Sequence, residues 1–160
     1  MTLIKSISGF RGTIGGKPDA GLTPVDIVKL TSAYICLIRR SGIRRPRIVV
    51  GRDGRLSGTM VNQLVCGSLQ AMGADVVDIG LSTTPTVEVA VTEMKADGGV
   101  ILTASHNPRE WNALKLLNSR GEFISKEEGE WLLEKAAADD YEFSNIDEIG
   151  IYSVENDWIK

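Results

Sequence analysis

The sequence has few residues of the kinds that form disulfides, metal sites or histidine-based catalytic groups. Its 160 residues include 2 cysteines and 1 histidine. Cys36 and Cys66 both lie in patterns typical of amphipathic helices, where a free cysteine usually packs as a small apolar side chain, so we expect neither a disulfide nor a metal site there. His106 directly follows Ser105, and adjacent side chains project in different directions. Because there is no second histidine, a Ser-His-Asp triad is excluded.

Long apolar runs, targeting signals and acidic clusters are also missing. No segment approaches the roughly 18 uninterrupted apolar residues of a membrane helix, so we expect no membrane partner. The first residues, MTLIKSISGF, lack the pattern of a secretory signal, which favours a cytoplasmic location. Aromatic residues make up 6% of the chain and are not interleaved with basic ones, which argues against a nucleic-acid partner. There is no cluster such as D-x-D-x-D to hold a divalent cation.

The charges that are present are unevenly distributed. Residues 1–121 contain 15 Lys and Arg against 9 Asp and Glu, whereas residues 122–160 contain 3 against 12, and the net charge is −3. The positive part also contains all the candidate site residues discussed below. A locally positive surface suits a small anionic molecule, and we expect the ligand to be of that kind.

Short β-rich runs alternate with helical periods along the chain. Expected strands cover 47–53, 74–80, 98–102 and 113–117, and expected helices cover 23–40, 57–73, 84–96 and 126–138. This alternation is typical of an α/β sheet with helices on its faces. The connection before the last strand is too short for a helical crossover, so that strand is expected to run antiparallel. We predict a three-layer α/β/α sandwich with a four-stranded mixed, mostly parallel sheet.

The strongest candidate site follows the strand at 98–102, in the stretch VILTASHNPREWNALKLL. Ligands of open α/β sheets bind beyond the carboxyl ends of strands, and Ser105 lies three residues past such an end. Without a base or a nucleophile elbow, Ser105 suits the role of a phosphoryl carrier better than that of an acyl-transfer nucleophile. Lys115 is placed to reach back toward Ser105. The alternatives are that the loop only reverses the chain and that Lys115 extends to solvent from an edge strand.

Two further segments could bind an anion. In SGFRGTIGG, residues 8–16, four glycines surround Arg11 and could leave backbone N–H groups free to form an anion nest; the alternative is a flexible turn. In GRDGRLSG, residues 51–58, Arg52 and Arg55 could hold an anion at a helix N-terminus. The alternative there is a local ion-pair network with Ser57 as the N-cap.

These three segments together resemble one enzyme family. GGVILTASHNPREWNALKLL closely resembles the phosphoserine loop of the α-D-phosphohexomutases, the group of phosphoglucomutase, phosphomannomutase and phosphoglucosamine mutase. SGFRGTIG resembles the Gly-x-Arg-Gly segment of that family, and VVGRDGRLSG resembles its Gly-Arg-Asp-x-Arg segment. The resemblance covers about residues 4–138. It implies that residues 1–138 form the first of four domains, with 139–160 as a linker and the start of a truncated second domain.

The resemblance also implies a mechanism. Ser105 would carry the phosphoryl group that moves between C1 and C6 of a hexose phosphate through a sugar bisphosphate, which also serves as the activator. Lys115 and Arg11 would flank the phosphoserine, and His106 and Asn107 would line the site. The implied phosphate-binding residues also include Gly12, Arg52 and Arg55. The phosphate on Ser105 would supply one ligand of Mg²⁺, and the remaining domains would supply most of the others, so the isolated chain is expected to be inactive.

The sequence departs from the family pattern at two places. Lys5-Ser6-Ile7 stands where Phe-Gly-Thr is frequent, and Ala113 stands where glycine is frequent. These departures affect the assignment to a subgroup more than the chemistry. The sugar is not determined, because a later domain of the family mainly distinguishes glucose, mannose and glucosamine phosphates. The alternative function is a non-catalytic phosphate-binding module, and a hydrolase is disfavoured by the missing base.

Overall fold

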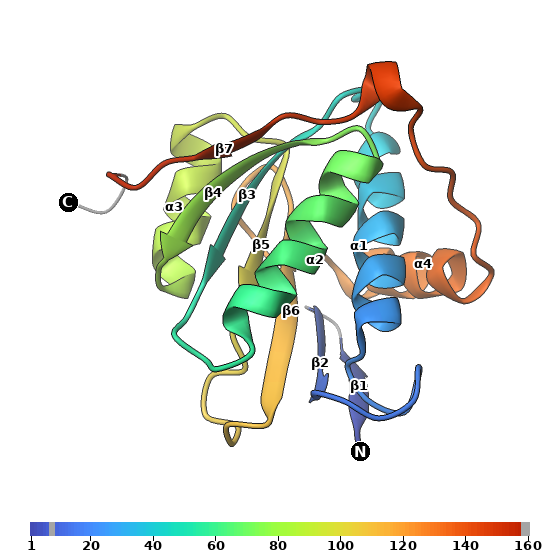
Figure 1. Cartoon of the computed structure of the whole chain (residues 1–160). Coiled ribbons are helices and arrows are strands. Elements are labelled where there is room, and N and C mark those ends of the chain that lie inside the picture. The colour runs from blue at the N-terminus through green and yellow to red at the C-terminus, as the bar shows by residue number, and fades with distance from the viewer. Residues whose placement is uncertain (7–8, 158–160) are drawn as a thin grey trace.

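The computed structural model describes residues 1–6 and 9–157, and its elements form one sheet with helices on both faces (Figure 1). The strands are β1 (Leu3–Ser6), β2 (Gly9–Thr13), β3 (Arg47–Arg52), β4 (Asp75–Leu81), β5 (Gly98–Leu102), β6 (Trp111–Leu117) and β7 (Tyr152–Val154). The helices are α1 (Pro24–Arg39), α2 (Gly58–Ala71), α3 (Thr84–Glu93), α4 (Lys126–Ala137) and the 3-10 turn η1 (Ile146–Glu148). None of the helices in this part of the chain is long and apolar enough to cross a membrane.

The sheet has seven strands in the order β1-β2-β6-β5-β3-β4-β7. The predicted α/β class is confirmed, but the predicted number of four strands is wrong. Pairs β3–β4, β3–β5 and β4–β7 are parallel, whereas β1–β2, β2–β6 and β5–β6 are antiparallel. The antiparallel return of β6 beside β5 is therefore confirmed. The three additional strands extend the predicted sheet at both of its edges.

The two faces of the sheet bury different side chains, which gives the predicted three layers. Ile48 and Val50 of β3 pack in the larger cluster with α1, α2 and α4, whereas Val49 between them packs with α3. Successive side chains of a strand point to opposite faces, so a strand covered on both sides is apolar throughout. Figure 1 shows α1 and α2 crossing the front of the sheet and α3 lying on its other side.

Helices α1 and α4 both begin at a capping box. Thr23 caps α1 and Ser125 caps α4, and each forms a capping box with the acidic residue three positions later, Asp26 or Glu128. Each box satisfies two backbone donors at the helix start. These caps determine where α1 and α4 start, and the two helices pack against each other in the larger core cluster.

The two cysteines are free, as expected from the sequence. Cys66 on α2 is buried in the core, and burial raises the pKa of its thiol to about 12. Cys36 on α1 is half-buried, and burial raises the pKa of that thiol as well. Both thiols are therefore protonated at neutral pH and pack as small apolar groups.

Strand β2 replaces the glycine nest that the sequence predicts around Arg11, and that prediction is wrong. Its residues pair with β1 on one side and β6 on the other, which also excludes a flexible turn. Phe10 is 1% exposed and belongs to the larger core cluster. Gly12 is buried, and its backbone lies close to the carbonyl oxygen of Thr2. A Cβ added at Gly12 would lie 2.5 Å from that oxygen and 3.1 Å from Leu22 Cβ, so a side chain does not fit there.

Substitution of Gly12 by alanine is expected to destabilise the fold by about 1–3 kcal/mol, because the backbone carbonyl of Thr2, just before β1, cannot easily move aside for the added methyl group. The measurement is the free energy of unfolding in urea. Gly67→Ala on α2 is the matched control, since an added Cβ there meets nothing within 4 Å. A helical alanine in place of glycine is expected to leave stability unchanged or to raise it by up to about 1 kcal/mol. Equal stability of the Gly12→Ala variant and the wild type would contradict the close approach.

Beyond residue 138 the chain passes the C-terminal end of α2 before it reaches β7: the Ser144 N–H donates to the Ala71 carbonyl oxygen at 2.8 Å, and the Gly150 N–H donates to that of Gln70 at 2.9 Å. Asp75 at the start of β4 accepts hydrogen bonds from the Ile151 backbone N–H at 2.8 Å and from Arg45 at 2.9 and 3.1 Å. Burial acts to raise the pKa of this carboxyl, but these hydrogen bonds outweigh it and hold the pKa below its usual range. The division of the chain at residue 138 stays a prediction. The predicted start of a second domain includes residues 158–160, which lie outside the described residues.

Candidate active site

A cavity of about 490 Å³ opens where β2, β6 and the loop after β5 meet. Its described lining includes Arg11, Ser105, His106, Asn107 and Lys115. The topology explains why this part of the sheet is open. Helix α3 packs over β3 and β5, whereas the corresponding face of β2 and β6 carries Arg11 and Lys115 toward the cavity. The structure brings these five residues together at one cavity, and their roles stay predictions.

Ser105 and Lys115 are in direct contact. Lys115 Nζ donates a hydrogen bond to Ser105 Oγ at 3.0 Å. Lys115 lies on β6, which is flanked by β5 and β2, so the alternative of a lysine on an edge strand is wrong. Ser105 itself is exposed and has a φ of 53°. A serine rarely adopts this left-handed conformation. Other contacts of the loop must therefore stabilise the backbone that places the Ser105 hydroxyl next to Lys115.

Arg11 reaches the same cavity from the neighbouring strand. It stands opposite Ala113 in the β2–β6 register, two residues from the pair between Gly9 and Lys115. Residues two apart on a strand share a face, so Arg11 and Lys115 project from adjacent strands on the same side. The described lining contains no Asp or Glu. A cavity with two positively charged side chains and a hydroxyl is suited to a small anion such as a phosphate ester.

Three predicted phosphate-binding residues lie elsewhere. Gly12 is buried within the sheet, and Arg52 donates a hydrogen bond from Nη1 to the Asp53 carbonyl oxygen at 3.4 Å; neither belongs to the described lining of the cavity. Arg55 is turned into the loop behind Ser105, and its two Nη atoms donate to backbone carbonyl groups there. The Nη donors of Arg55 are therefore taken up by the loop, whereas the anion-binding role of Arg52 at the start of α2 stays a prediction.

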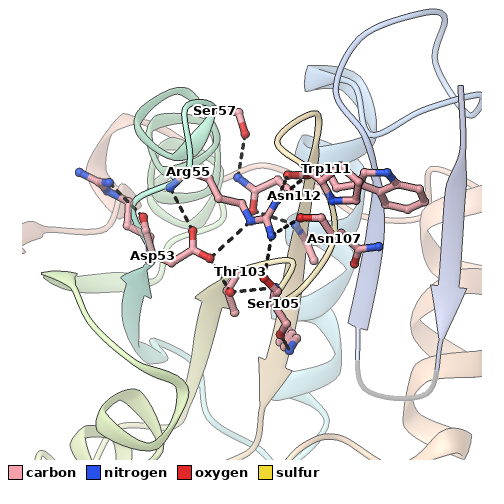
Figure 2. Close-up of polar contacts among 12 residues, drawn as sticks. Asp53, Arg55, Ser57, Thr103, Ser105, Asn107, Trp111 and Asn112 are labelled. Carbon is pink, nitrogen blue, oxygen red and sulfur yellow. Dashed lines mark hydrogen bonds and ion pairs between the residues drawn. The ribbon is translucent and has the colours of Figure 1, made fainter.

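Two further polar groups support the loop from behind (Figure 2). The hydroxyl of Thr103 donates to Asp53 Oδ2 at 2.5 Å and accepts the Ser105 N–H at 3.1 Å. Asn112 is fully buried, and its Nδ2 donates to Ser57 Oγ at 2.9 Å. Ser57 precedes α2 but makes no side-chain capping bond. These roles of Thr103 and Asn112 were not predicted from the sequence. A signal was present, since Thr103 directly follows the buried strand β5 and Asn112 lies near the start of β6.

The described residues do not by themselves form a metal site. No group of three or more His, Cys, Asp or Glu side chains in the described ranges could hold a metal ion. The Ser105 hydroxyl, already hydrogen-bonded to Lys115, offers a single oxygen. Magnesium prefers several oxygen ligands, usually including carboxylates. The donors among the described residues alone therefore do not fit Mg²⁺.

The sequence of this chain matches the model of a known protein family. Residues 3–143 match the family model described as phosphoglucomutase/phosphomannomutase, alpha/beta/alpha domain I. The chain belongs to the phosphoglucomutase/phosphomannomutase family. The match covers most of the chain and includes the Ser105 loop, the β2 segment and the segment after β3. The resemblance predicted from the three sequence segments is confirmed.

Relatives within the phosphoglucomutase/phosphomannomutase family carry several names. A phosphoglucomutase/phosphomannomutase of Thermococcus kodakarensis is 38% identical over 141 residues, which are 87% of this chain and 31% of the relative. A phosphoglucosamine mutase of Thermobifida fusca is 39% identical over 129 residues, which are 79% of this chain and 28% of the relative. The names of these relatives differ in the sugar, so sequence similarity at this level does not identify one.

A solved structure of the family has the same fold. The phosphoglucomutase/phosphomannomutase family protein of Burkholderia thailandensis superposes with a TM-score of 0.81 and 27% identity, over 96% of this chain and 33% of that one. The chain thus spans about a third of the length of the relatives that it matches. It corresponds to domain I of the phosphoglucomutase/phosphomannomutase family.

Proposed function

We propose that this chain is the phosphoryl-carrying domain of a phosphohexomutase, which moves a phosphoryl group between C1 and C6 of a hexose phosphate. The observation that carries the proposal is the hydrogen bond of 3.0 Å from Lys115 Nζ to Ser105 Oγ at the edge of a positive cavity. The family membership supports the same reaction. The substrate is a hexose phosphate, and a sugar bisphosphate is both the intermediate and the activator.

The reaction consists of two phosphoryl transfers in opposite directions. In the first, a sugar hydroxyl oxygen forms a bond to the phosphorus on Ser105 while the bond from phosphorus to Ser105 Oγ breaks. The sugar hydroxyl gives up one proton and Ser105 Oγ gains one, so that the serine is again a hydroxyl. Lys115 donates a hydrogen bond at Ser105 Oγ, where negative charge develops as this oxygen leaves. The bisphosphate then turns over in the site. In the second transfer, Ser105 Oγ forms a bond to the other phosphorus while the bond from that phosphorus to the sugar oxygen breaks, and the serine hydroxyl gives up one proton as the sugar oxygen gains one. The serine is phosphorylated again, and the product is the isomeric hexose phosphate.

The other residues of the cavity hold the anion. Arg11 lies on the strand next to Lys115, and its guanidinium suits a phosphate oxygen pair. His106 and Asn107 border the same space and bind substrate groups. A loose phosphoryl-transfer transition state is stabilised mainly by positive charge and by positioning, which is what these residues provide. Phosphate on Ser105 would supply one Mg²⁺ ligand, with carboxylates from the remaining domains supplying the rest and the ion adding charge neutralisation.

The longer protein that contains this domain is expected to carry phosphate on Ser105. Its intact mass after treatment with a hexose bisphosphate should exceed the sequence mass by about 80 Da, and the Ser105→Ala variant should lack this increment. The wild type should turn over hexose phosphate, and Ser105→Ala should lose most of that activity while keeping the same fold by circular dichroism. Near-normal turnover by Ser105→Ala would refute the carrier role.

The alternative is a domain that binds phosphate without transferring it. The positive cavity suits this function as well, since it needs Arg11 and Lys115 but no reactive serine. The same mass measurement distinguishes the two functions, because a binding module retains no covalent phosphoryl group after denaturation. The contact between Lys115 and Ser105 favours the transferase, since a binding site gains nothing from directing its lysine to a serine hydroxyl.

The 160-residue chain alone is expected to show no mutase activity, because the described residues provide only one side of the site. The assay combines the chain with Mg²⁺, a hexose 1-phosphate and a hexose bisphosphate, and measures the 6-phosphate formed. The longer protein in the same assay is the positive control. Turnover by the short chain at a comparable rate would contradict the need for the remaining domains.

A further inference from the structure

The side chain of Arg55 binds the Ser105 loop through four backbone carbonyl groups (Figure 2). Its Nη2 donates to the carbonyl oxygens of Ser105 at 2.9 Å and Asn107 at 2.8 Å. Its Nη1 donates to those of Pro108 at 2.8 Å and Trp111 at 3.0 Å. These bonds use all four hydrogens of the two Nη atoms. The guanidinium therefore links the whole loop, from its serine to the first residue of β6, to the segment that precedes α2.

Asp53 places the guanidinium for this contact. Its Oδ2 lies 3.5 Å from Arg55 Nε, and its Oδ1 accepts the Arg55 backbone N–H at 3.2 Å. The Arg55 side chain is 11% exposed, so it is well shielded from water within the loop. Through the hydroxyl of Thr103, the same carboxylate also holds the Ser105 N–H. Asp53 and Arg55 thus fix both the N–H and the C=O of Ser105.

This double contact accounts for the unusual backbone of Ser105. A serine with a φ of 53° lies in a region that residues other than glycine rarely occupy, and such a residue persists only where its surroundings determine it. The turn Ser105-His106-Asn107-Pro108 has no helix or strand ladder of its own. Arg55 supplies the fixed partner that the loop lacks, and its contacts leave the Ser105 hydroxyl directed at Lys115.

We propose that Arg55 is a positioning residue for phosphoryl transfer: it fixes the Ser105 loop so that Oγ meets the same partners when it gives and when it takes a phosphoryl group. The inference rests on the proposed function, because it assigns Arg55 to the same transfer. It differs from a phosphate-binding role, since the four Nη hydrogens already bind loop carbonyl groups. An arginine suits this role because its planar fork presents donors in fixed directions, which the single ammonium of lysine does not.

The test is a set of Arg55 variants in the longer, active protein. Arg55→Lys keeps the positive charge but not the four contacts, and its kcat is expected to fall by about 100-fold, the cost of a misplacement of about 1 Å. The KM for hexose phosphate should change by less than about threefold, because Arg55 does not bind the substrate. Arg120→Lys is the matched control: Arg120 pairs with Glu122 on an exposed turn beyond the other end of β6, so kcat and KM should stay at wild-type values.

Two readouts separate positioning from general loss of structure. Millimolar guanidinium chloride should raise the kcat of Arg55→Ala at least about tenfold, because the free ion can occupy the same cluster of carbonyl groups. The kcat of the wild type should not rise. Hydrogen exchange should become faster in residues 103–111 of this variant and stay unchanged in the core strands. Rescue together with local exchange supports the inference even where a variant loses stability.

Other results would overturn the inference. Wild-type kcat in Arg55→Lys would exclude the positioning role, and a large rise in KM with unchanged kcat would indicate phosphate binding instead. Folded Arg55→Ala without guanidinium rescue and without faster loop exchange would show that the loop is held by other contacts. A wild-type protein that carries no phosphate on Ser105 would overturn the proposed function, and this inference with it. The results for the Arg55 variants described above would overturn this inference alone, so the two failures are distinguishable.

Discussion

Replacement of Lys115 by methionine is expected to slow phosphoryl transfer to and from Ser105 by about 100-fold to 1,000-fold, the typical cost of removing one donor to a developing negative charge. Lys115 Nζ lies 3.0 Å from Ser105 Oγ, so it meets the oxygen that leaves in one transfer and attacks in the other. Methionine has nearly the same length and no charge, and the half-buried position on β6 accommodates it. The measurement is kcat in the longer, active protein, together with the rate of a single transfer from phosphorylated Ser105.

The control for this variant is Lys126→Met, which removes an exposed lysine from the first turn of α4, an element that packs with α1 away from the cavity. Its kcat should equal the wild-type value. Unfolding temperatures of the two variants should differ little, because neither position contributes to the core. A Lys115→Met enzyme that transfers phosphate at the wild-type rate would remove Lys115 from the mechanism and leave its contact with Ser105 as a local hydrogen bond.

Replacement of Phe10 by alanine is expected to lower the free energy of unfolding by about 3–5 kcal/mol, the usual cost of deleting a buried phenylalanine. Phe10 is 1% exposed and packs in the larger core cluster. The expected loss is a large part of the stability of an ordinary domain, about 5–15 kcal/mol. Since Phe10 anchors the strand that carries Arg11, its loss should also weaken phosphate binding in the cavity. Urea denaturation measures the first effect, and titration with inorganic phosphate measures the second.

Phe143→Ala provides the matched control. Phe143 is 49% exposed and packs edge-on against Tyr141 at a ring distance of 5.6 Å. Its removal is expected to cost no more than about 1 kcal/mol, because little apolar area is lost. If Phe10→Ala cost as little as this control, the segment around Arg11 would be the loosely held glycine loop that its sequence suggests, and the strand would contribute little to the fold.

The parts of the fold that the sequence predicts well are those where local pattern and tertiary environment agree. Strands β3 and β5 are buried on both faces, so each appears as an uninterrupted apolar run. Strand β2 was not predicted because Gly9 and Gly12 are typical of loops, yet both lie where backbone from another segment leaves no room for a side chain. Strand β7 was missed for a different reason. All three of its residues are exposed, so it shows no apolar alternation.

The site shows the same division between local and distant contacts. Ser105 and Lys115 were predicted to meet because they flank one short connection between two antiparallel strands. Arg55 was assigned to an anion because its own segment, GRDGRLSG, contains nothing that shows its partners. Those partners lie about 50 residues further along the chain, and only the parallel pairing of β3 with β5 brings them together. A single sequence does not reveal contacts of this range.

The central claim is that Ser105 passes its phosphoryl group to a sugar. The most direct measurement uses the longer protein with radiolabelled phosphate on Ser105, mixed with unlabelled hexose monophosphate in a rapid-quench instrument. We predict that the label leaves the protein within one turnover and appears in hexose bisphosphate, and that Ser105→Ala takes up no label. Label that stays on the protein, or that is released as inorganic phosphate without entering a sugar, would contradict the claim.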